Sequence, residues 1–430
     1  MVYRLDTRHA GFAEEFETLL GSKREVSEDV NATVAAILND VRLRGDEAVL
    51  AYTDRFDQLA LTASTLAFSK DELDEAEASI SGEVRDALLF ARDRIVSHHE
   101  KQKPLDHIYE DALGVTLGTV WTPVDAVGIY VPGGTAVYPS SVLMGAVPAK
   151  VAGVPRVALT VPTPRGVVAP AVLAAAKIGG VDEMYRIGGA QAIGALAYGT
   201  ATIKPVSKIF GPGNAYVAAA KRQVYGIVGI DMVAGPSEVL VIADKSANPA
   251  WIAADLLAQA EHGGGAQSIL VTTDPALADS VAIEVGRQMA LLPRADIARS
   301  GWDEFGAIII VQSLAEAVEL ANRIASEHVE LMIDDPQALA PKIRNAGAIF
   351  LGHHTPEAIG DYVGGSNHVL PTARSARYTS GLGVIDFMKR TSILSCDPGS
   401  LAALAPAAVT LANTEGLDAH GRSISIRLNR

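Results

Sequence analysis

From about residue 124, short apolar runs rich in β-branched residues alternate with longer Ala-rich runs. The short runs have the length of buried strands and the long ones the length of helices. Because parallel neighbours need a crossover between them, this alternation predicts parallel sheet covered by helices. The pattern restarts at residues 234–237, which predicts two α/β units with a hinge there. The expected strands are Ala126–Val131, Arg156–Pro162, Glu183–Ile187, Lys208–Phe210, Glu238–Ala243, Ser268–Thr272, Ala307–Val311, Val329–Ile333 and Ala348–Leu351.

The intervening and flanking segments are expected to be helical. Between the strands, helices are predicted at Ser140–Ala152, Val167–Ile178, Pro249–His262 and Ser313–Ser326. The first 110 residues are more polar, and Val30–Phe56 and Glu72–His99 carry apolar residues at helical spacing. After Pro398, an Ala-rich helical run continues to about Asn413. Its small residues permit close packing, either on a partner subunit or on its own domain.

The composition excludes several classes of protein. The 430 residues carry a formal net charge of −14, which disfavours binding to nucleic acid or to anionic membranes. The one cysteine excludes an intrachain disulfide and a multi-cysteine metal site, and it fits a reducing cytoplasm. The amino terminus lacks the basic and apolar regions of a signal peptide. The uncharged run 126–149 contains Pro and Gly residues that a lipid-exposed helix tolerates badly. We therefore expect a cytoplasmic protein.

Three glycine-containing loops follow expected strands. They are Tyr130-Val-Pro-Gly-Gly, Gly188-Gly-Ala-Gln191 and Gly211-Pro-Gly-Asn214. Strand ends are the usual ligand side of an α/β sheet, and glycine lets backbone amides approach a phosphate or carboxylate. None of the loops has the G-x-G-x-x-G dinucleotide fingerprint, and for a single loop a purely conformational role is the simpler explanation.

Four further segments combine acids, amides and histidines. Gln259 and His262 lie three residues apart and share one helix face, where they could grip an ion; a histidine at a helix end is the simpler alternative. Glu327-His328 lies where a helix runs into a strand, and such a pair could activate water and move protons. The last two segments are Gly360-Asp361-Tyr-Val-Gly-Gly-Ser-Asn-His368 and Glu415-Gly-Leu-Asp-Ala-His420, each of which could equally be an ordinary loop.

The single cysteine, Cys396, is expected to be inert. It lies in Ile393-Leu-Ser-Cys-Asp-Pro, without a neighbouring histidine or a Gly-rich turn to stabilise an oxyanion. Oxidation of an aldehyde in this chain would then need activated water.

Taken together and in this order, the motifs resemble the histidinol dehydrogenase family from about residue 24 to the end. The matching stretches are Val127-Gly-Ile-Tyr-Val-Pro-Gly-Gly, Gly188-Gly-Ala-Gln-Ala-Ile, Gly211-Pro-Gly-Asn-Ala-Tyr-Val, Asp231-Met-Val-Ala-Gly-Pro-Ser-Glu-Val-Leu, Ala253-Ala-Asp-Leu-Leu-Ala-Gln-Ala-Glu-His, Ser326-Glu-His-Val-Glu, Gly360-Asp-Tyr-Val-Gly-Gly, Asn367-His-Val-Leu-Pro-Thr and Glu415-Gly-Leu-Asp-Ala-His.

The resemblance implies an NAD-dependent, zinc-containing enzyme that oxidises L-histidinol to L-histidine through a bound aldehyde. The implied zinc ligands are Gln259, His262, Asp361 and His420. The implied NAD contacts are Tyr130, Gln191 and Asn214. The implied substrate contacts are Ser237, Gln259, His262, His328, Asp361, Glu415 and His420. Glu327 would activate water, His328 would shuttle protons, and zinc would position the substrate.

The resemblance also implies a layout of two Rossmann-like parallel-sheet domains facing each other, with small helical terminal segments. Residues 1–24 would form the amino-terminal helical segment, and 25–129 with 237–380 a discontinuous first domain that carries the metal and catalytic residues. Residues 130–236 would form the second domain, on the NAD side. Residues 381–430 would pack on the partner subunit of a homodimer with shared active sites.

One departure and two alternatives accompany the resemblance. Gly263-Gly264-Gly265 follows His262 where the family usually has an acid and bulkier residues. A same-fold dehydrogenase of another amino or sulfonated alcohol is one alternative, although the residues that match the zinc and histidinol contacts are all present. A non-catalytic, two-lobed ligand-binding protein is the other, although simple capture needs no proton-shuttling pair such as Glu327-His328.

Overall fold

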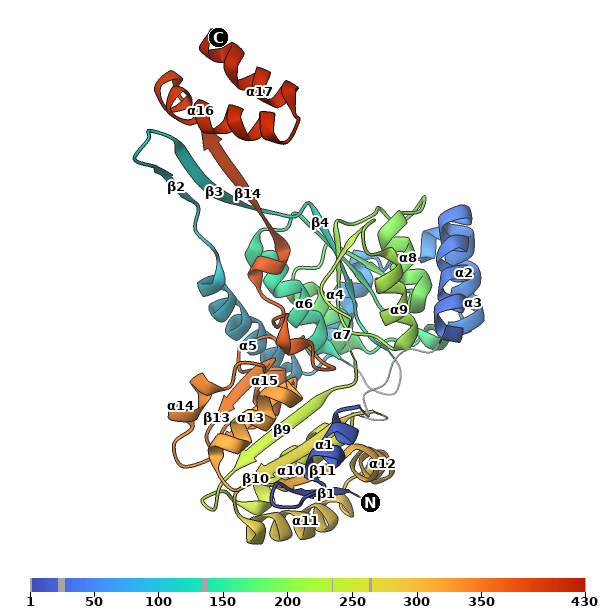
Figure 1. Cartoon of the computed structure of the whole chain (residues 1–430). Coiled ribbons are helices and arrows are strands. Elements are labelled where there is room, and N and C mark those ends of the chain that lie inside the picture. Colours follow the sequence, from blue (N-terminus) through green and yellow to red (C-terminus); the bar gives the residue numbers. More distant parts are fainter. Residues whose placement is uncertain (1, 22–27, 134–137, 234, 263–264, 430) are drawn as a thin grey trace.

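The computed structural model describes residues 2–21, 28–133, 138–233, 235–262 and 265–429, and it contains two parallel β-sheets covered by helices (Figure 1). This confirms the expected fold class. In the described part of the chain, no helix is both long and apolar enough to cross a membrane. Ala234, in the expected hinge, lies outside the described residues.

The first sheet has six parallel strands in the order β1-β11-β10-β9-β12-β13. Its strands are β1 (Tyr3–Asp6), β9 (Glu238–Ala243), β10 (Gln267–Thr272), β11 (Ala307–Ile310), β12 (His328–Met332) and β13 (Ala348–Leu351). Helices cover both faces: α1 (Phe12–Gly21), α13 (Leu314–Ile324) and α14 (Pro336–Leu339) on one, and α10 (Pro249–Ala260), α11 (Pro275–Met289) and α12 (Ala295–Phe305) on the other. A further helix, α15 (Glu357–Tyr362), contacts α10.

The central strand of this sheet explains why its sequence is a continuous apolar run. Leu240 and Ile242 of β9 point into the cluster under α1 and α13, whereas Val239 and Val241 point into the cluster under α10 and α11. Successive side chains of a strand face opposite sides, so a strand buried on both faces needs apolar residues at every position.

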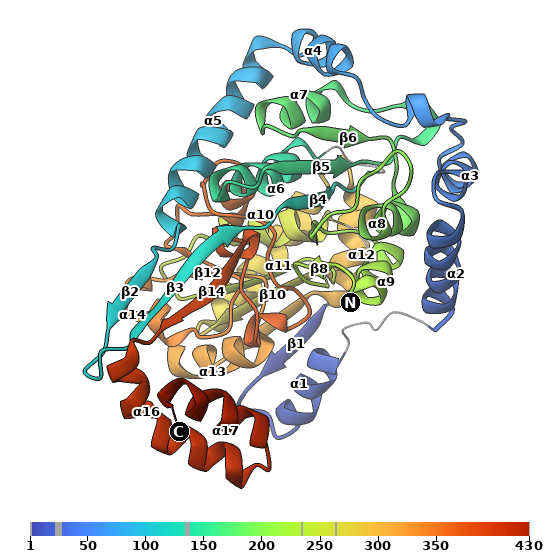
Figure 2. The ribbon, with the colours of Figure 1, turned by 90° about the horizontal axis from the view of Figure 1, so that it is seen from above.

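The second sheet has five parallel strands in the order β6-β5-β4-β7-β8. They are β4 (Ala126–Tyr130), β5 (Arg156–Thr160), β6 (Glu183–Tyr185), β7 (Lys208–Phe210) and β8 (Gly229–Ile230). One face packs on α4 (Lys70–Ser79), α5 (Gly82–His99), α6 (Pro139–Ala152) and α7 (Pro170–Ile178), and the other on α2 (Glu28–Arg44), α3 (Asp46–Asp57), α8 (Gly189–Tyr198) and α9 (Ala215–Val224). Figure 2 shows α2 and α3 on one side of this sheet and α4 and α5 on the other.

The terminal segments are placed differently from the expected layout in two respects. Strand β4 is part of the second sheet and helices α2 to α5 pack against that sheet, although residues 25–129 were expected in the first domain. Residues 1–24 contribute α1, as expected, but they also contribute β1, which pairs in parallel with β11. An apolar stripe predicts that a helix is buried on one side, and it does not specify the sheet that the helix covers.

An antiparallel arm, not expected from the sequence, projects from the body and carries the carboxyl-terminal helices (Figure 1). Its strands are β2 (His107–Glu110), β3 (Thr116–Pro123) and β14 (Met388–Ser395), followed by α16 (Pro398–Thr414) and α17 (Asp418–Ser425). Large apolar side chains are exposed on this arm, among them Leu105, Leu394 and Leu411. Short 3-10 turns lie at Ala63–Thr65, Glu100–Gln102, Pro164–Gly166, Ala340–Lys342, Ser375–Arg377, Val384–Phe387 and Ile426–Leu428.

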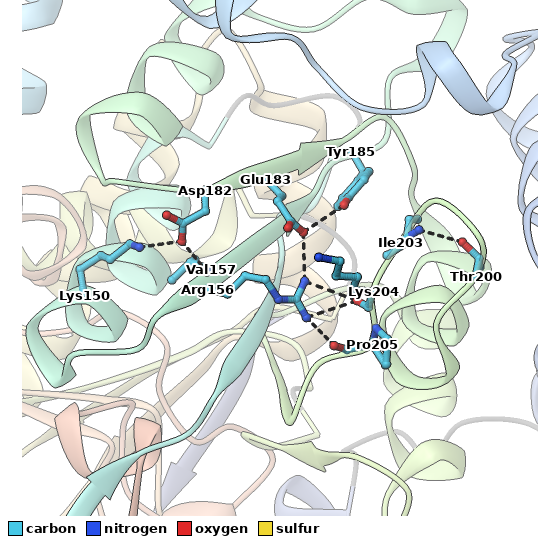
Figure 3. Close-up of polar contacts among 10 residues, drawn as sticks. All are labelled: Lys150, Arg156, Val157, Asp182, Glu183, Tyr185, Thr200, Ile203, Lys204 and Pro205. Atoms are coloured by element: carbon cyan, nitrogen blue, oxygen red, sulfur yellow. Dashed lines mark hydrogen bonds and ion pairs between the residues drawn. The ribbon is translucent and has the colours of Figure 1, made fainter.

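A polar network fastens the amino-terminal ends of β5 and β6 (Figure 3). Arg156 Nη1 lies 3.0 Å from Glu183 Oε2, and the Tyr185 hydroxyl donates to the same oxygen at 3.0 Å. The Arg156 guanidinium also donates to the carbonyl oxygens of Lys204 and Pro205. Burial and the Glu183 carboxylate raise the pKa of Tyr185, so its phenol stays protonated and remains a donor.

Replacing Arg156 with Met is expected to lower the free energy of unfolding by about 1–3 kcal/mol, because Glu183 and two loop carbonyls lose a charged donor. Urea unfolding followed by circular dichroism measures the change. Arg299, exposed on α12, supplies the control: Arg299→Met should change the free energy of unfolding by less than about 0.5 kcal/mol. Equal unfolding midpoints for both variants would show that the network adds no stability.

Candidate active site and nucleotide cavity

The Glu327-His328 pair lies at the amino-terminal end of β12, as the sequence predicts. Helix α13 ends at Ile324, and Ala325 takes a left-handed conformation with φ 52° that turns the chain into the strand. Glu327 and His328 are 5% and 4% exposed. Both side chains are therefore fixed by the sheet and lie in a largely water-excluded setting.

The Glu327 carboxylate is oriented by the neighbouring strand. Its Oε2 accepts the backbone N–H of Glu238 at 2.9 Å, and the Glu327 carbonyl accepts from Ala348 at 2.8 Å. Gly347 permits this pairing, since a Cβ there would lie 2.5 Å from the Glu327 carbonyl oxygen. The carboxylate thus has a defined position beside the histidine: Oε2 lies 3.7 Å from His328 Nδ1.

The His328 ring has a defined tautomer. Its Nδ1 lies 3.0 Å from the carbonyl oxygen of Glu238, which only accepts, so Nδ1 carries the proton. Nε2 has no hydrogen-bond partner among the described residues and faces Asp361 Oδ1 at 3.8 Å. Burial lowers the pKa of His328. The ring is therefore a neutral base with Nε2 as its accepting atom.

Three buried carboxyls that the sequence analysis did not single out form a connected group, of which Glu357 lies beside this histidine. Glu357 Oε2 lies 3.5 Å from His328 Nδ1, and Glu330 Oε1 accepts the backbone N–H of Glu357 at 2.7 Å. Burial raises the pKa of Glu330 and Glu357 well above the usual range and raises the pKa of Asp255 to about 6. Glu330 is two residues from His328 on the same strand, and side chains two positions apart on a strand point to the same face. This spacing is the sequence signal that could have identified Glu330.

Three of the four implied metal ligands lie on neighbouring elements. Gln259 lies in the last turn of α10, His262 follows this helix, and Asp361 lies on α15, which contacts α10. The Gln259 side chain is buried and its amide nitrogen has no hydrogen-bond partner among the described residues, so this amide is available to a ligand. Among the described residues, no three His, Cys, Asp or Glu side chains gather closely enough to hold a metal ion. Gly263 and Gly264 lie outside the described residues.

The fourth implied ligand, His420, is not brought to this group within the chain. His420 and the implied substrate contact Glu415 are exposed on the tail formed by α16 and α17. Figure 1 shows this tail at the opposite end of the molecule from α10 and α15. Ser237, by contrast, directly precedes Glu238 at the start of β9, beside the Glu327 carboxylate.

All three implied nucleotide contacts line one cavity of about 770 Å³ at the carboxyl-terminal ends of the second sheet. Tyr130 ends β4, and its hydroxyl accepts the backbone N–H of Gly189 at 3.1 Å. Asn214 begins α9, and its Oδ1 accepts from Tyr216 and Val217 at 3.1 and 3.2 Å. The Gln191 amide oxygen is buried and has no hydrogen-bond partner in the part of the chain that the structure describes. Burial raises the pKa of Tyr130 to about 12, so its hydroxyl stays neutral.

Another wall of this cavity comes from α3 and was missed by the sequence analysis. Tyr52, Arg55, Phe56 and Asp57 line it, together with Pro162 after β5. Burial raises the pKa of Asp57. The four α3 residues lie more than 70 positions from Tyr130, and no local motif marks them, because only the packing of α3 on the second sheet brings them here.

Helix α6, which covers the second sheet, contacts the segment of chain that follows α15. Ser141, near the start of α6, lies 3.3 Å from His368 Nε2, and the other ring nitrogen of His368 lies 3.0 Å from the Asp361 carbonyl oxygen. Asn367 donates to the Met144 carbonyl oxygen of the same helix at 2.7 Å. Through these contacts α6, which packs on the second sheet, is joined to Asp361 of α15, whose side chain faces His328.

Cys396 follows β14 on the projecting arm and is partly buried. A thiol at this place has no described basic partner to activate it. If the chain carries out the two NAD-dependent oxidations that the sequence resemblance implies, Cys396→Ser should retain both at wild-type rates within about twofold. Rates with histidinol and with histidinaldehyde, each measured by NADH absorbance, check this. Selective loss of aldehyde oxidation in the folded variant would point to a covalent thiohemiacetal instead.

Comparison with known proteins gives a consistent result over the whole chain. The family model for histidinol dehydrogenase matches residues 21–428. Histidinol dehydrogenase of Rhizobium meliloti (strain 1021) is 62% identical over 429 residues, covering 100% of this chain and 99% of the relative. That of Agrobacterium fabrum is 63% identical over 429 residues, with the same coverage. The crystal structure of histidinol dehydrogenase from Elizabethkingia anophelis superposes with a TM-score of 0.95 at 37% identity, covering 100% of this chain and 98% of that one.

The expected enzyme class is therefore confirmed. The full-length similarity to these proteins shows that the chain is an oxidoreductase and belongs to the histidinol dehydrogenase family.

Proposed function

We propose that this chain oxidises L-histidinol to L-histidine through L-histidinaldehyde in histidine biosynthesis, as a four-electron, NAD-dependent alcohol dehydrogenase. The observation that carries the proposal is the buried Glu327-His328 pair, in which one strand orients both the carboxylate and the imidazole. NAD would accept a hydride in each of the two oxidations. Tyr130, Gln191 and Asn214 would hold it in the cavity of the second sheet.

In both oxidations His328 moves the proton. Its Nε2 accepts the proton of the alcohol oxygen, because Nδ1 is already committed to the Glu238 carbonyl oxygen. Low exposure keeps bulk water from competing for this step. In the second oxidation, the Glu327 carboxylate takes a proton from water, and the resulting hydroxide adds to the aldehyde carbon. Ser237, next to the Glu238 amide that holds Glu327, is placed to contact the substrate.

The donor set of Gln259, His262 and Asp361 supports a zinc site. Imidazole and carboxylate are ordinary zinc ligands, and the buried side chain of Gln259, whose amide nitrogen has no hydrogen-bond partner among the described residues, would add its amide oxygen as a further donor. When bound, zinc would hold the imidazole and amino nitrogens of the substrate in place. We propose that His420 of a second copy completes the set, since the tail that carries it projects away from its own site.

This arrangement requires an intertwined homodimer, in which residues 381–430 pack on the partner subunit. The exposed Leu394, Leu411 and Leu417 on the arm and tail support such an interface, because large apolar side chains gathered on a projecting segment usually mark a contact surface. Glu415 would reach the partner's substrate together with His420. A cytoplasmic location fits the lone cysteine and the biosynthetic role.

Removing the metal is expected to abolish the formation of NADH from L-histidinol, and adding Zn²⁺ should restore it. His262→Asn should lower the zinc bound per chain as well as the affinity for histidinol, because an imidazole ligand is lost. Elemental analysis of the purified protein reads metal content independently of activity. His9→Asn, an exposed histidine at the amino terminus, is the matched control and should keep wild-type zinc content. Full activity in a preparation shown to be metal-free would refute the metal requirement.

A further inference from the structure

A fully buried ion pair lies directly behind the loop that follows β7. Lys221, on the last turns of α9, and Asp231, just after β8, form an ion pair in which both side chains are 2% exposed. Neither residue lines the nucleotide cavity. Two opposite charges therefore lie in the core of the second sheet without touching the ligand space.

Both charged side chains hydrogen-bond the backbone of one residue, Gly211. Lys221 Nζ donates to the Gly211 carbonyl oxygen at 2.9 Å, and the Gly211 N–H donates to Asp231 Oδ2 at 2.8 Å. The backbone N–H of Asp231 in turn donates to the Ile209 carbonyl oxygen at 3.1 Å, which ties Asp231 to the end of β7. Every backbone polar group of Gly211 thus turns toward the ion pair.

Gly211 is also pressed against the wall of the cavity. Its φ is 111°, a conformation that side chains rarely adopt, and a Cβ there would lie 2.1 Å from the Tyr130 carbonyl oxygen. Tyr130 itself lines the cavity. The position of Gly211 is consequently fixed on one side by β4 and on the other by Lys221 and Asp231.

Asn214, three residues after Gly211, connects the restraint on Gly211 with the cavity that would hold the ligand. It lines the cavity and caps α9 through Tyr216 and Val217. Lys221 also lies on α9, the helix that Asn214 caps. The ion pair therefore holds the loop 211–214 against α9. Displacing Gly211 would move Asn214 relative to Tyr130 across the cavity.

Stability alone does not account for such a pair. Taking two charges out of water costs several kcal/mol each, and well-packed apolar residues at such places are often as stable. Unlike apolar side chains, the two charged side chains supply a donor for the Gly211 carbonyl and an acceptor for the Gly211 N–H, at a residue whose backbone has the unusual φ of 111°.

We propose that Lys221 and Asp231 are positioning residues of the nucleotide site: by holding Gly211 they set the loop 211–214 in the conformation that receives a dinucleotide. The inference rests on the proposed use of the cavity for NAD. It predicts that the pair governs nucleotide affinity and leaves histidinol affinity unchanged.

The test is a graded pair of double variants of the zinc-loaded enzyme, titrated with NADH by fluorescence and with histidinol by calorimetry. Lys221→Met with Asp231→Asn removes the charges but keeps an acceptor for the Gly211 N–H. Lys221→Met with Asp231→Leu removes both contacts. We expect the dissociation constant for NADH to rise about tenfold in the second variant and by less in the first, with histidinol binding as in the wild type.

The control is Lys150→Met with Asp182→Asn, which removes an ion pair of 2.6 Å at the opposite, amino-terminal ends of the same sheet (Figure 3). It should leave NADH binding unchanged. A folded Lys221 and Asp231 double variant with wild-type affinity for NADH overturns the inference. So does the unfolding of both variants, since the pair would then be a requirement of the fold. If the wild-type enzyme does not bind NADH, the proposed function fails instead.

Discussion

Glu327→Gln is expected to slow the oxidation of supplied histidinaldehyde by about 10²–10⁴-fold, the usual cost of losing a general base, and to slow the first hydride transfer from histidinol much less. The glutamine oxygen can still accept the Glu238 N–H that now holds Glu327 Oε2 at 2.9 Å, so the side chain should keep its place. What it loses is the ability to take a proton from water, which only the aldehyde step needs.

His328→Ala should damage both steps, because both require a proton to leave oxygen and Nε2 is the accepting atom oriented for it. Single-turnover bursts of NADH with histidinol, beside steady rates with the aldehyde, measure each step for each variant. Glu319→Gln, an exposed glutamate on α13, is the control and should leave both rates unchanged. Equal slowing of the two steps by Glu327→Gln would show that this division of roles is mistaken.

Mixing two inactive variants should restore activity. In the proposed dimer each site takes Glu327 from one chain and His420 from the other. A heterodimer of a His420→Ala chain and a Glu327→Gln chain therefore has one site with both residues intact. Random exchange of subunits should bring back about a quarter of the wild-type rate, since half of the dimers are mixed and half of their sites are whole.

A second mixture provides the control for subunit complementation. Glu327 and His328 lie on the same chain segment, so mixing Glu327→Gln with His328→Ala should leave every site defective whatever the exchange. Native mass spectrometry shows whether heterodimers have formed. If heterodimers of the first mixture are present and it stays inactive, the sites are not shared between chains.

Much of the fold follows from local sequence pattern. The expected strands Glu238–Ala243 and Ala348–Leu351 agree with β9 and β13 to the residue. Strands of a parallel sheet are buried on both faces, so each is an uninterrupted apolar run with polar residues at its ends. The same reasoning placed Glu327-His328 at a helix-to-strand junction and the three glycine loops at strand ends, where the structure has them.

Other features carried no such pattern. Strands β2 and β14 are largely exposed, so no apolar run marks them, and pairing with β3 across some 270 residues of chain is what makes β14 a strand. Val30–Phe56 was expected as a single helical stretch, and the structure divides it at Gly45 with φ 56°.

The sequence by itself identified the residues proposed to bear the chemistry and most of the helices and buried strands, because local motifs and hydrophobic patterns depend on neighbours a few positions apart. Only the tertiary structure decided that α3 closes the nucleotide cavity, that Glu357 reaches His328, and that the tail with His420 projects away from its own site. Each of these depends on the sheet against which a buried face packs. An apolar stripe on a helix can be buried against any apolar surface. The sheet against which it packs is therefore decided by how well the side chains of the whole core fit together.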